Sequence, residues 1–369
     1  MYNNRMAKSA PEYVGFGMLT PVEIMVLEKL PKHNTGAVVT EVNEFVFDDA
    51  AIVACLLRQW DVTSGMIGTA LGDDARGHAL AKQMKAWGVQ GTIRFTKEYK
   101  TPLEVNVSDR KGARTYFWQR TPQILSTLNT ANLSLLRGAK IMYADWYDGD
   151  HILRAIDEAG RLKVPVFVNL EHGHKDPDIL KQYAQRATFC QAVTDAAQLG
   201  GKRALMETAR KLLKSGIKTA IITLAKGGCL VAQDDQIVRV FAPQVKAVDA
   251  CGAGATFSAG FIYGYLKGWT LEQSARFATA AATLKVTRPG LQMFAVEQIS
   301  ELADRLQVEH WAFKNNRFEI IEKILDFPRQ VAAQGQRAQR KILHELRIPE
   351  KQESRRVNHP SARTKRKVV

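Results

Sequence analysis

Two glycines separated by one residue, in Gly252-Ala253-Gly254, stand between an expected strand and an expected helix. The strand ends near Asp249, and an apolar helical stretch then runs to about Leu266. Glycine permits a tight turn and lets a ligand approach the backbone, and the N–H groups that begin a helix attract anions. We therefore interpret Gly252, Ala253 and Gly254 as an anion hole for a phosphate. A glycine-rich turn without any ligand fits Gly-x-Gly alone equally well.

Polar side chains also follow two other expected strands. Asp145 and Asp148 follow the first, where either a ligand or solvent could satisfy them. Glu171, His172 and His174 follow the second, and these residue types suit a metal ion or a proton acceptor. A polar loop that caps the next helix is the favoured interpretation of this second group.

The elements that must position these residues alternate, from residue 13 to about residue 290, between short β-rich runs and amphipathic helical stretches. This alternation is typical of an α/β sheet with helices on both faces. Core strands are expected at 65–68, 140–143, 164–169, 189–193 and 219–223, and helices at 150–161, 176–186 and 202–214. Strands of a small projecting sheet are expected at 36–46, 92–95, 103–107 and 114–118, with a hairpin turn at 109–112.

Composition excludes several classes of protein. The 369 residues are 46% hydrophobic and 24% charged, which suffices for a large buried core. No apolar run reaches the ~18 residues that a membrane span needs, so we expect no membrane insertion. The first residues lack the apolar stretch of a secretory signal, so we expect a cytoplasmic location. The four cysteines are scattered, without metal-ligand spacing, as buried thiols in a reducing compartment would be.

The net charge of +15 is concentrated near the end of the chain. Residues 311–369 carry 15 Lys and Arg against 6 Asp and Glu. We expect helices at 315–326 and 330–346 and disorder from about 349. The tail could contact nucleic acid or an acidic partner, but it has no aromatic residue after Phe327 for base stacking, and a solvated tail is favoured. The expected organisation is an arm (1–12), an α/β domain (13–308), a helical extension (309–348) and a disordered basic tail (349–369).

Residues 248–257, Val-Asp-Ala-Cys-Gly-Ala-Gly-Ala-Thr-Phe, resemble the second signature of the ribokinase (PfkB) carbohydrate-kinase family, Asp-Thr-x-Gly-Ala-Gly-Asp-x-Phe. Residues 222–228 resemble its nucleotide loop, and residues 275–290 resemble the helix and turn beside its adenine site. Residues 68–89 and 145–149 resemble further family segments, the last one from the sulfofructose-kinase-like branch. The likeness runs in the right order over roughly residues 13–305.

This resemblance implies a ribokinase-like three-layer α/β sandwich with a small β-sheet lid, and a dimer formed through that lid. It also implies ATP and Mg²⁺ as cofactors and a small sugar or sugar-acid as substrate. The residues that it assigns to the nucleotide are Thr223, Lys226, Gly228, Ala281 and Lys285. Asp145 and Asp148 are the candidate substrate residues of the body. On the expected lid, Arg114 and Arg120 could contact an anionic substrate such as a phosphate or sulfonate, or equally well be exposed strand residues.

The chain departs from the family pattern at the catalytic position. The last Asp of the signature, which takes the proton of the sugar hydroxyl, is Ala255 here. Loss of a general base typically costs ~10²–10⁴-fold in rate. Asp249 comes six residues earlier, and we doubt that its carboxylate reaches the same point.

The acceptor and metal sides also depart from the pattern. Thr20 or Pro21 stands where the family has a sugar-binding Asp, and residues 45–53 lack its Gly-Gly and Asn. We expect Phe45 and Phe47 to fill that pocket and Asp48 or Asp49 to cap the helix that follows. The metal motif retains only Asp195.

Two functions follow from these departures. One is ATP-dependent phosphoryl transfer to a sugar hydroxyl, weak or lost because the base is missing. The alternative is a nucleotide-binding pseudokinase or scaffold that acts through protein or nucleic-acid partners.

Overall fold

A ten-stranded mixed sheet forms the centre of the computed structural model, which describes residues 10–109, 114–194, 201–291, 293–314 and 317–320. Its order is β16 (Arg317–Ile320), β15 (Val308–Lys314), β14 (Gln236–Val240), β13 (Cys229–Gln233), β12 (Thr219–Thr223), β11 (Phe189–Val193), β10 (Val166–Glu171), β9 (Ile141–Asp145), β1 (Tyr13–Gly17) and β4 (Ser64–Gly68). The six strands from β12 to β4 are parallel, and β13 to β16 are added antiparallel. The carboxyl ends of the parallel strands therefore meet at one edge of the sheet, where such folds bind ligands.

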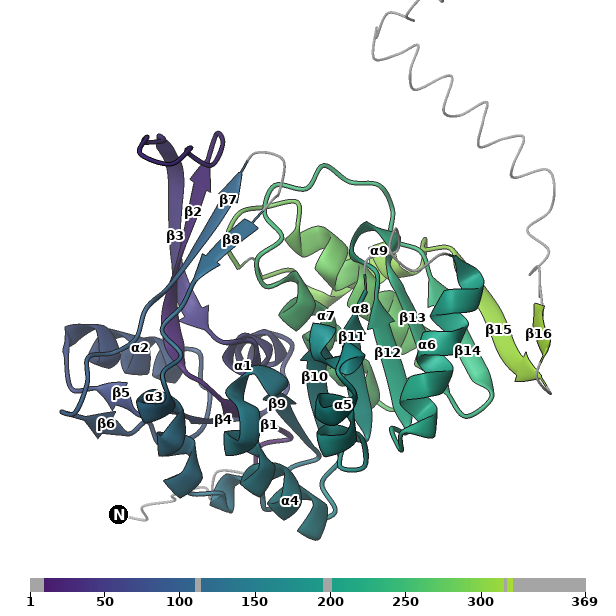
Figure 1. Ribbon diagram of the computed structural model, residues 1–369, viewed down its shortest axis with the longest axis horizontal. Coiled ribbons are helices and arrows are strands. Elements are labelled where there is room, and N and C mark those ends of the chain that lie inside the picture. Colours follow the sequence, from purple (N-terminus) through teal and green to yellow (C-terminus); the bar gives the residue numbers. More distant parts are fainter. Residues whose placement is uncertain (1–9, 110–113, 195–200, 292, 315–316, 321–369) are drawn as a thin grey trace, which may run out of the picture. The chain divides into compact units, whose positions relative to one another are not determined.

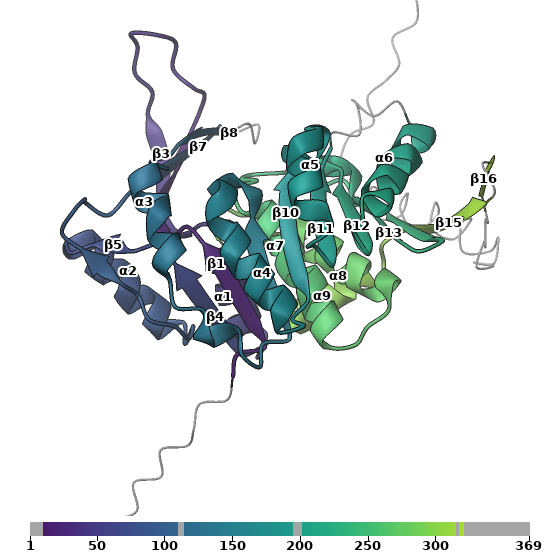
Figure 2. The same cartoon turned by 60° about the horizontal axis from the view of Figure 1, so that its bottom comes forward.

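Helices cover both faces of this sheet (Figures 1 and 2). One hydrophobic core includes residues of α1 (Asp49–Gln59), α2 (Ala75–Ala86), α7 (Ala253–Leu266), α8 (Leu271–Lys285) and α9 (Val296–Ala303). The core on the other face includes residues of α4 (Leu153–Arg161), α5 (Pro177–Ala184) and α6 (Lys202–Lys214). The short helix α3 (Pro122–Ser126) precedes β9 in the chain. The result is the expected three-layer α/β sandwich.

A four-stranded lid projects from the body (Figure 1). Its order is β3 (Val39–Phe47), β2 (Thr20–Leu27), β7 (Glu104–Asp109) and β8 (Arg114–Phe117). β7 and β8 are antiparallel, as expected for a hairpin, and the turn itself lies outside the described residues.

Two expectations about strands are corrected. The run at 92–95 contributes no lid strand, because β6 (Phe95–Thr96) pairs instead with β5 (Leu71–Gly72) in a separate two-stranded sheet. β2 supplies the fourth lid strand, which we did not expect from the sequence. Buried and half-buried residues alternate along it, as in a strand with one face on a core.

The region after residue 308 also differs from expectation. β15 pairs with β14 and β16 pairs with β15, so the main sheet continues to Ile320 rather than ending at 308. The helix expected at 315–326 is wrong over Arg317–Ile320, which form β16. The arm before residue 10, the rest of the extension and the basic tail lie outside the described residues. None of the helices in the described part of the chain is both long and apolar enough to span a membrane.

Local sequence explains why the helices that carry the site begin where they do. Asp48 caps α1 by accepting from the Asp49 N–H at 2.7 Å, as expected. Thr270 and Gln273 form a reciprocal capping box at the start of α8. Gly260 of α7 lets α8 approach closely, since a Cβ there would lie 2.7 Å from the Ala278 Cα.

We predict that Gly260→Ala destabilises the fold by about 1–3 kcal/mol, because the added methyl group must push two packed helices apart. The matched control is Gly160→Ala in α4, where an added Cβ meets no atom within 4 Å. The control should be neutral or stabilising by up to about 1 kcal/mol, through better helix propensity. Urea unfolding measures both changes, and equal stability of the two variants would contradict the packing argument.

Candidate functional site

The glycine turn of residues 252–254 begins helix α7 at the carboxyl edge of the sheet. Gly252 is the N-cap residue and adopts a left-handed conformation with φ 71°, which favours glycine. No side chain caps α7, and its first turn contains no acidic residue. An uncapped helix start with a glycine at its entry is suited to an anion such as a phosphate.

Ala255 is fully buried in the first turn of α7. Its methyl group can neither accept a proton nor contact a metal ion. The position where the family signature carries an acid therefore holds a small apolar side chain that packs into the core.

Asp249 is held in place just before the turn. Its Oδ1 accepts hydrogen bonds from the Ser108 hydroxyl and the Cys251 N–H, both at 2.9 Å. Its Oδ2 accepts from the Lys285 ammonium at 2.8 Å and the Gly290 N–H at 3.1 Å. A carboxylate has about four acceptor positions, and here four donors occupy them. Asp249 is thus a structural anchor of the turn rather than a replacement for the missing base.

Two residues expected at the nucleotide are buried within α8. Lys285 has no exposed side-chain surface, and its ammonium contacts the carboxylate of Asp249 and, at 3.0 Å, its backbone carbonyl. Ala281 is also buried. Lys285 therefore holds the segment before the glycine turn in place and has no exposed surface to offer to a ligand.

The other expected nucleotide residues surround a short loop between β12 and β13. Thr223 ends β12 half-buried, and Lys226 is exposed on the loop. Gly228 has φ 90°, and a Cβ there would lie 2.3 Å from the Val240 carbonyl oxygen, so only glycine fits. The structure therefore brings Thr223, Lys226 and Gly228 together on one short loop at the end of β12.

Arg239 on β14 supports this loop and was missed by sequence reasoning. Its guanidinium is buried and donates to the carbonyl oxygens of Gly227 at 2.7 Å and Cys229 at 2.9 Å, and also to that of Val240. Burial lowers the pKa of Arg239. The sequence does contain a signal for Arg239, which is a charged residue among the apolar residues of β14. The sequence alone could not show that backbone carbonyls are its partners.

The acceptor side of the site is built around a buried ion-pair triad. Arg120, which follows β8, contacts Asp148 at 2.6 Å and also forms a short contact with Asp48. Asp148 further accepts the Met18 N–H at 2.8 Å. Arg120 was expected to contact an anionic substrate, but the chain's own carboxylates neutralise it. Asp148, expected to face the substrate, is fully buried by the same contacts.

Asp145 begins a polar row that crosses the sheet to the glycine turn. It accepts from the Asn169 amide at 2.9 Å, and Asn169 lies opposite Gln191 on the next strand. Gln191 accepts from the Ser258 hydroxyl at 2.9 Å and donates to the Gly254 carbonyl at 3.4 Å. The row therefore connects the acceptor edge with the start of α7 through buried contacts. Burial, with the nearby Asp148 charge, raises the pKa of Asp145 to about 7.

The remaining candidates are distributed as follows. His174 is buried, and its ring contacts the Glu171 carbonyl, while Asp176 caps α5. No cluster of three potential metal-ligating residues occurs in the part of the chain that the structure describes. Arg114 lies on β8 opposite Ser108. Asp195 lies outside the described residues.

The acceptor-side phenylalanine Phe45 packs edge-to-face against Trp87, with ring centroids 6.2 Å apart. Phe45 falls within the lid strand expected at 36–46, and the structure has it on lid strand β3, just before α1 begins at Asp49. It contributes apolar surface next to the core that contains α1.

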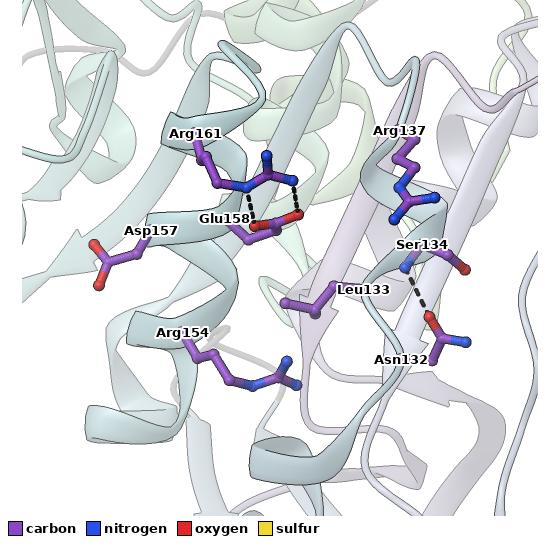
Figure 3. A pocket seen from close by; sticks show the side chains of 8 residues that line it. All are labelled: Asn132, Leu133, Ser134, Arg137, Arg154, Asp157, Glu158 and Arg161. Carbon is purple, nitrogen blue, oxygen red and sulfur yellow. Dashed lines mark hydrogen bonds and ion pairs between the residues drawn. The ribbon is translucent and has the colours of Figure 1, made fainter.

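A surface hollow of about 440 Å³ lies beside α4, which packs on the opposite face of the sheet from α7 (Figure 3). Arg137, Arg154 and Arg161 line it, and Arg161 forms a two-pronged ion pair with Glu158 at 2.7 Å. Arg154 donates to two backbone carbonyls. The hollow thus has charged walls but shares no residue with the glycine turn.

A family model described as "pfkB family carbohydrate kinase" matches residues 30–298, which include lid strands β3, β7 and β8, the Arg120 ion pairs and the glycine turn. The chain belongs to this family. It is 25% identical over 243 residues to an ATP-dependent 6-phosphofructokinase of Thermoanaerobacterium thermosaccharolyticum, covering 62% of this chain and 74% of that protein. It is 26% identical over 273 residues to fructokinase-2 of Solanum lycopersicum, covering 65% and 80% respectively.

Solved structures share the fold of this pfkB-family chain. The ribokinase of Arabidopsis thaliana, solved with ribose and ATP, superposes with a TM-score of 0.64 at 19% identity, covering 80% of this chain and 99% of that one. A nucleoside kinase of Burkholderia thailandensis, solved with inosine, gives 0.66 at 17% identity, covering 79% and 97%. At these identities the likeness establishes the ribokinase-like fold.

We predict that Lys285→Met destabilises the chain by roughly 3–5 kcal/mol, because it leaves the Asp249 carboxylate buried without its counter-charge. The control is Lys140→Met, which breaks an exposed 2.7 Å pair with Glu12 and should cost at most about 1 kcal/mol. Chemical unfolding measures both. Similar small losses in the two variants would refute the structural role of the buried pair.

Asp145 makes the stability of the chain depend on pH. Its raised pKa means that the folded chain keeps this proton to about pH 7, whereas the unfolded chain releases it near the ordinary value of 3.8. The stabilisation is therefore complete at low pH and is lost as pH rises from about 4 to 7. We predict that Asp145→Asn removes this dependence, by up to about 4 kcal/mol across the range. Unfolding at several pH values tests this, with Asp150→Asn at an exposed site as control; parallel curves for wild type and Asp145→Asn would contradict it.

Proposed function

We propose that this pfkB-family chain binds ATP and transfers its γ-phosphoryl group to a sugar hydroxyl only weakly, or not at all. The observation that carries the proposal is the contrast within the first turn of α7. Its uncapped start suits a phosphate, whereas its buried Ala255 offers no proton acceptor. The nucleotide half of the site is kept and the chemistry of the acceptor half is impaired.

In this proposal Gly252, Ala253 and Gly254 stabilise the charge of the transferring phosphoryl group with backbone N–H groups. The loop at Thr223, Lys226 and Gly228 borders the nucleotide. The lack of a cap on α7 fits a triphosphate, whose oxygens would supply the missing acceptors.

Mg²⁺ would accompany the nucleotide and neutralise its phosphates. Mg²⁺ usually keeps several waters and takes only one or two protein carboxylates together with phosphate oxygens. Asp195 remains the candidate that would hold a metal-bound water.

The polar residues at the acceptor edge are proposed to face a sugar. Asp145 is 2% exposed, so it would support this edge through its contact with Asn169 rather than bind a sugar hydroxyl directly. Arg114, on lid strand β8, remains a candidate for the sugar. Since two carboxylates neutralise Arg120, an uncharged sugar fits this edge better than a sugar-acid or sugar phosphate.

We predict that Ala255→Asp raises sugar-dependent ADP formation at least ~100-fold, because it restores a general base beside the phosphate site. ATP binding, measured by calorimetry with and without Mg²⁺, should be seen in both wild type and variant. The matched control is Ala253→Asp, which adds the same charge to the first turn at a neighbouring position and should give no gain. No ATP binding by either wild type or Ala255→Asp would refute the proposed nucleotide site.

A second function, that of a nucleotide-binding pseudokinase or scaffold, is favoured by the Arg120 triad. Its two carboxylates are paired with an arginine of the chain itself, as a site without an acceptor would allow. In this form the protein would act in the cytoplasm in one of two ways. It would form a homodimer through the lid, or it would bind nucleic acid or an acidic partner through the basic tail. A chain ending at Glu322 retains the described sheet and would lose these tail interactions. Unchanged partner binding after that truncation would exclude the tail.

A further inference from the structure

Three alternating residues of lid strand β7 turn polar side chains toward the body of the protein. Glu104, Asn106 and Ser108 are 4%, 0% and 0% exposed. The direction is fixed by Ser108, whose hydroxyl donates to Asp249. It is supported by β2, where Val22 lies opposite Glu104 and belongs to the core that includes α1.

Two of these side chains lack the partners that buried polar groups normally have. The Asn106 amide nitrogen donates to Glu104 at 3.1 Å, but the Asn106 Oδ1 is buried without any hydrogen bond. Within the described residues Glu104 has no other hydrogen bond or ion pair. A buried oxygen left unpaired is costly and rare in folded proteins, so a site that supplies a donor is the natural explanation.

A chain of contacts places this polar face next to the segment that holds the glycine turn. Ile24 lies between Asn106 on one neighbouring strand and Asn43 on the other. The Asn43 side chain is 3.1 Å from the position of a Cβ on Gly290, whose N–H donates to Asp249. The row formed by Asn106, Ile24 and Asn43 therefore lies next to Gly290, whose N–H helps to hold Asp249 just before the glycine turn.

Glu104 lies two residues nearer the base of the lid than Asn106, or about 7 Å along the strand. It is therefore on the side of the polar face where β2 leaves the end of β1 and where α1 begins. An acceptor held between the glycine turn and the acceptor edge would lie beneath it.

We propose that Glu104 is the proton acceptor for phosphoryl transfer in this chain, and that Asn106 Oδ1 receives a second hydroxyl of the same acceptor. The lid would thus supply the base that α7 lacks. This inference rests on the weakly active form of the proposed function, since it requires ATP at the glycine turn and measurable transfer to a sugar.

In the proposed step the acceptor hydroxyl oxygen forms a bond to the γ-phosphorus, and the bond from that phosphorus to the β-bridging oxygen breaks. ADP leaves with the electron pair of the broken bond. The hydroxyl proton passes to the Glu104 carboxylate and returns to solvent when the lid opens. No oxidant, reductant or further reactant is needed.

The protonation behaviour of Glu104 agrees with this role. Burial raises the pKa of Glu104 to about 7, against a smaller opposing effect of the Asn106 hydrogen bond. The other charged or titratable groups that contacts or register place along this face are Asp249, Tyr116 opposite Asn106, Arg114 opposite Ser108, and Glu41 of β3, which shares the partner Val26 with Ser108. At the base of the lid Asp48 is already paired with Arg120. The ionised fraction of Glu104 therefore increases through neutral pH, and the rate should increase with it.

The test compares Glu104→Gln with wild type in full-length protein, with ATP, Mg²⁺ and a panel of D-ribose, D-fructose and fructose 6-phosphate. Glutamine has the shape of the protonated acid that burial already favours, so the lid should fold. We expect a loss of sugar-dependent ADP formation of at least ~100-fold, with unchanged ATP affinity by calorimetry. The rise in rate between pH 6 and 8 should disappear. Glu23→Gln, on the neighbouring lid strand and the other side of its alternation, is the matched control and should behave as wild type.

Two further variants keep the proposal falsifiable. Glu104→Asp keeps a carboxylate but withdraws it by one methylene, so its rate should be intermediate and retain the pH dependence. Ala255→Asp placed on Glu104→Gln should restore turnover, because a base at 255 makes the lid base dispensable.

The contrary outcomes separate the two proposals. Wild-type turnover that survives Glu104→Gln within twofold, with ATP bound, would overturn the role of Glu104 alone. Absence of turnover in wild type, together with turnover in Ala255→Asp, would also overturn it and leave the proposed nucleotide site standing. Failure of wild type to bind ATP would overturn both.

Discussion

The site depends on the buried ion pair between Asp249 and Lys285. Neither side chain is exposed, so both lose their hydration, and this cost is offset only because the geometry is good and other donors complete the network. The Asp249 carboxylate also accepts from the lid, through Ser108, and from the backbone on both sides of the turn. One carboxylate thereby fixes the glycine turn, the end of α8 and one edge of the lid relative to each other.

From this anchor the two halves of the site have different properties. On the side of the glycine turn, α7 begins without a cap, and Gly228 and Arg239 shape the loop between β12 and β13 next to backbone carbonyls. On the acceptor side, Ala255 is apolar, while Arg120 is held by two carboxylates of the chain itself. The polar row from Asp145 to Gln191 lies between the two halves: Asn169 donates to Asp145, Asn169 and Gln191 are register partners, and Gln191 donates to the Gly254 carbonyl.

Much of this arrangement could be predicted from the sequence. The bounds of β11, β12 and α6 agree with the expected residues, because buried parallel strands are short continuous apolar runs and amphipathic helices have a clear period. The turn at 252–254 was also predictable, because its two glycines and the strand and helix on either side are local features of the sequence. Three features were not predictable, because each depends on residues far away in the chain. They are the ion pair of Lys285, the carbonyl partners of Arg239 and the buried Asn106 Oδ1 that has no hydrogen bond. The strand at Arg317–Ile320 was misread because its pairing with β15, not its own pattern, determines its conformation.

The central claim is that the nucleotide site has been kept while the proton acceptor of α7 has been lost. The most direct measurement is a crystal structure of the full chain with Mg²⁺ and a non-hydrolysable ATP analogue at saturating concentration. The account predicts γ-phosphate oxygens within hydrogen-bonding distance of the backbone N–H groups of Gly252–Gly254, with the base stacked near the loop at Lys226. A structure in which the nucleotide binds elsewhere, or in which the turn holds no phosphate at saturation, would contradict it.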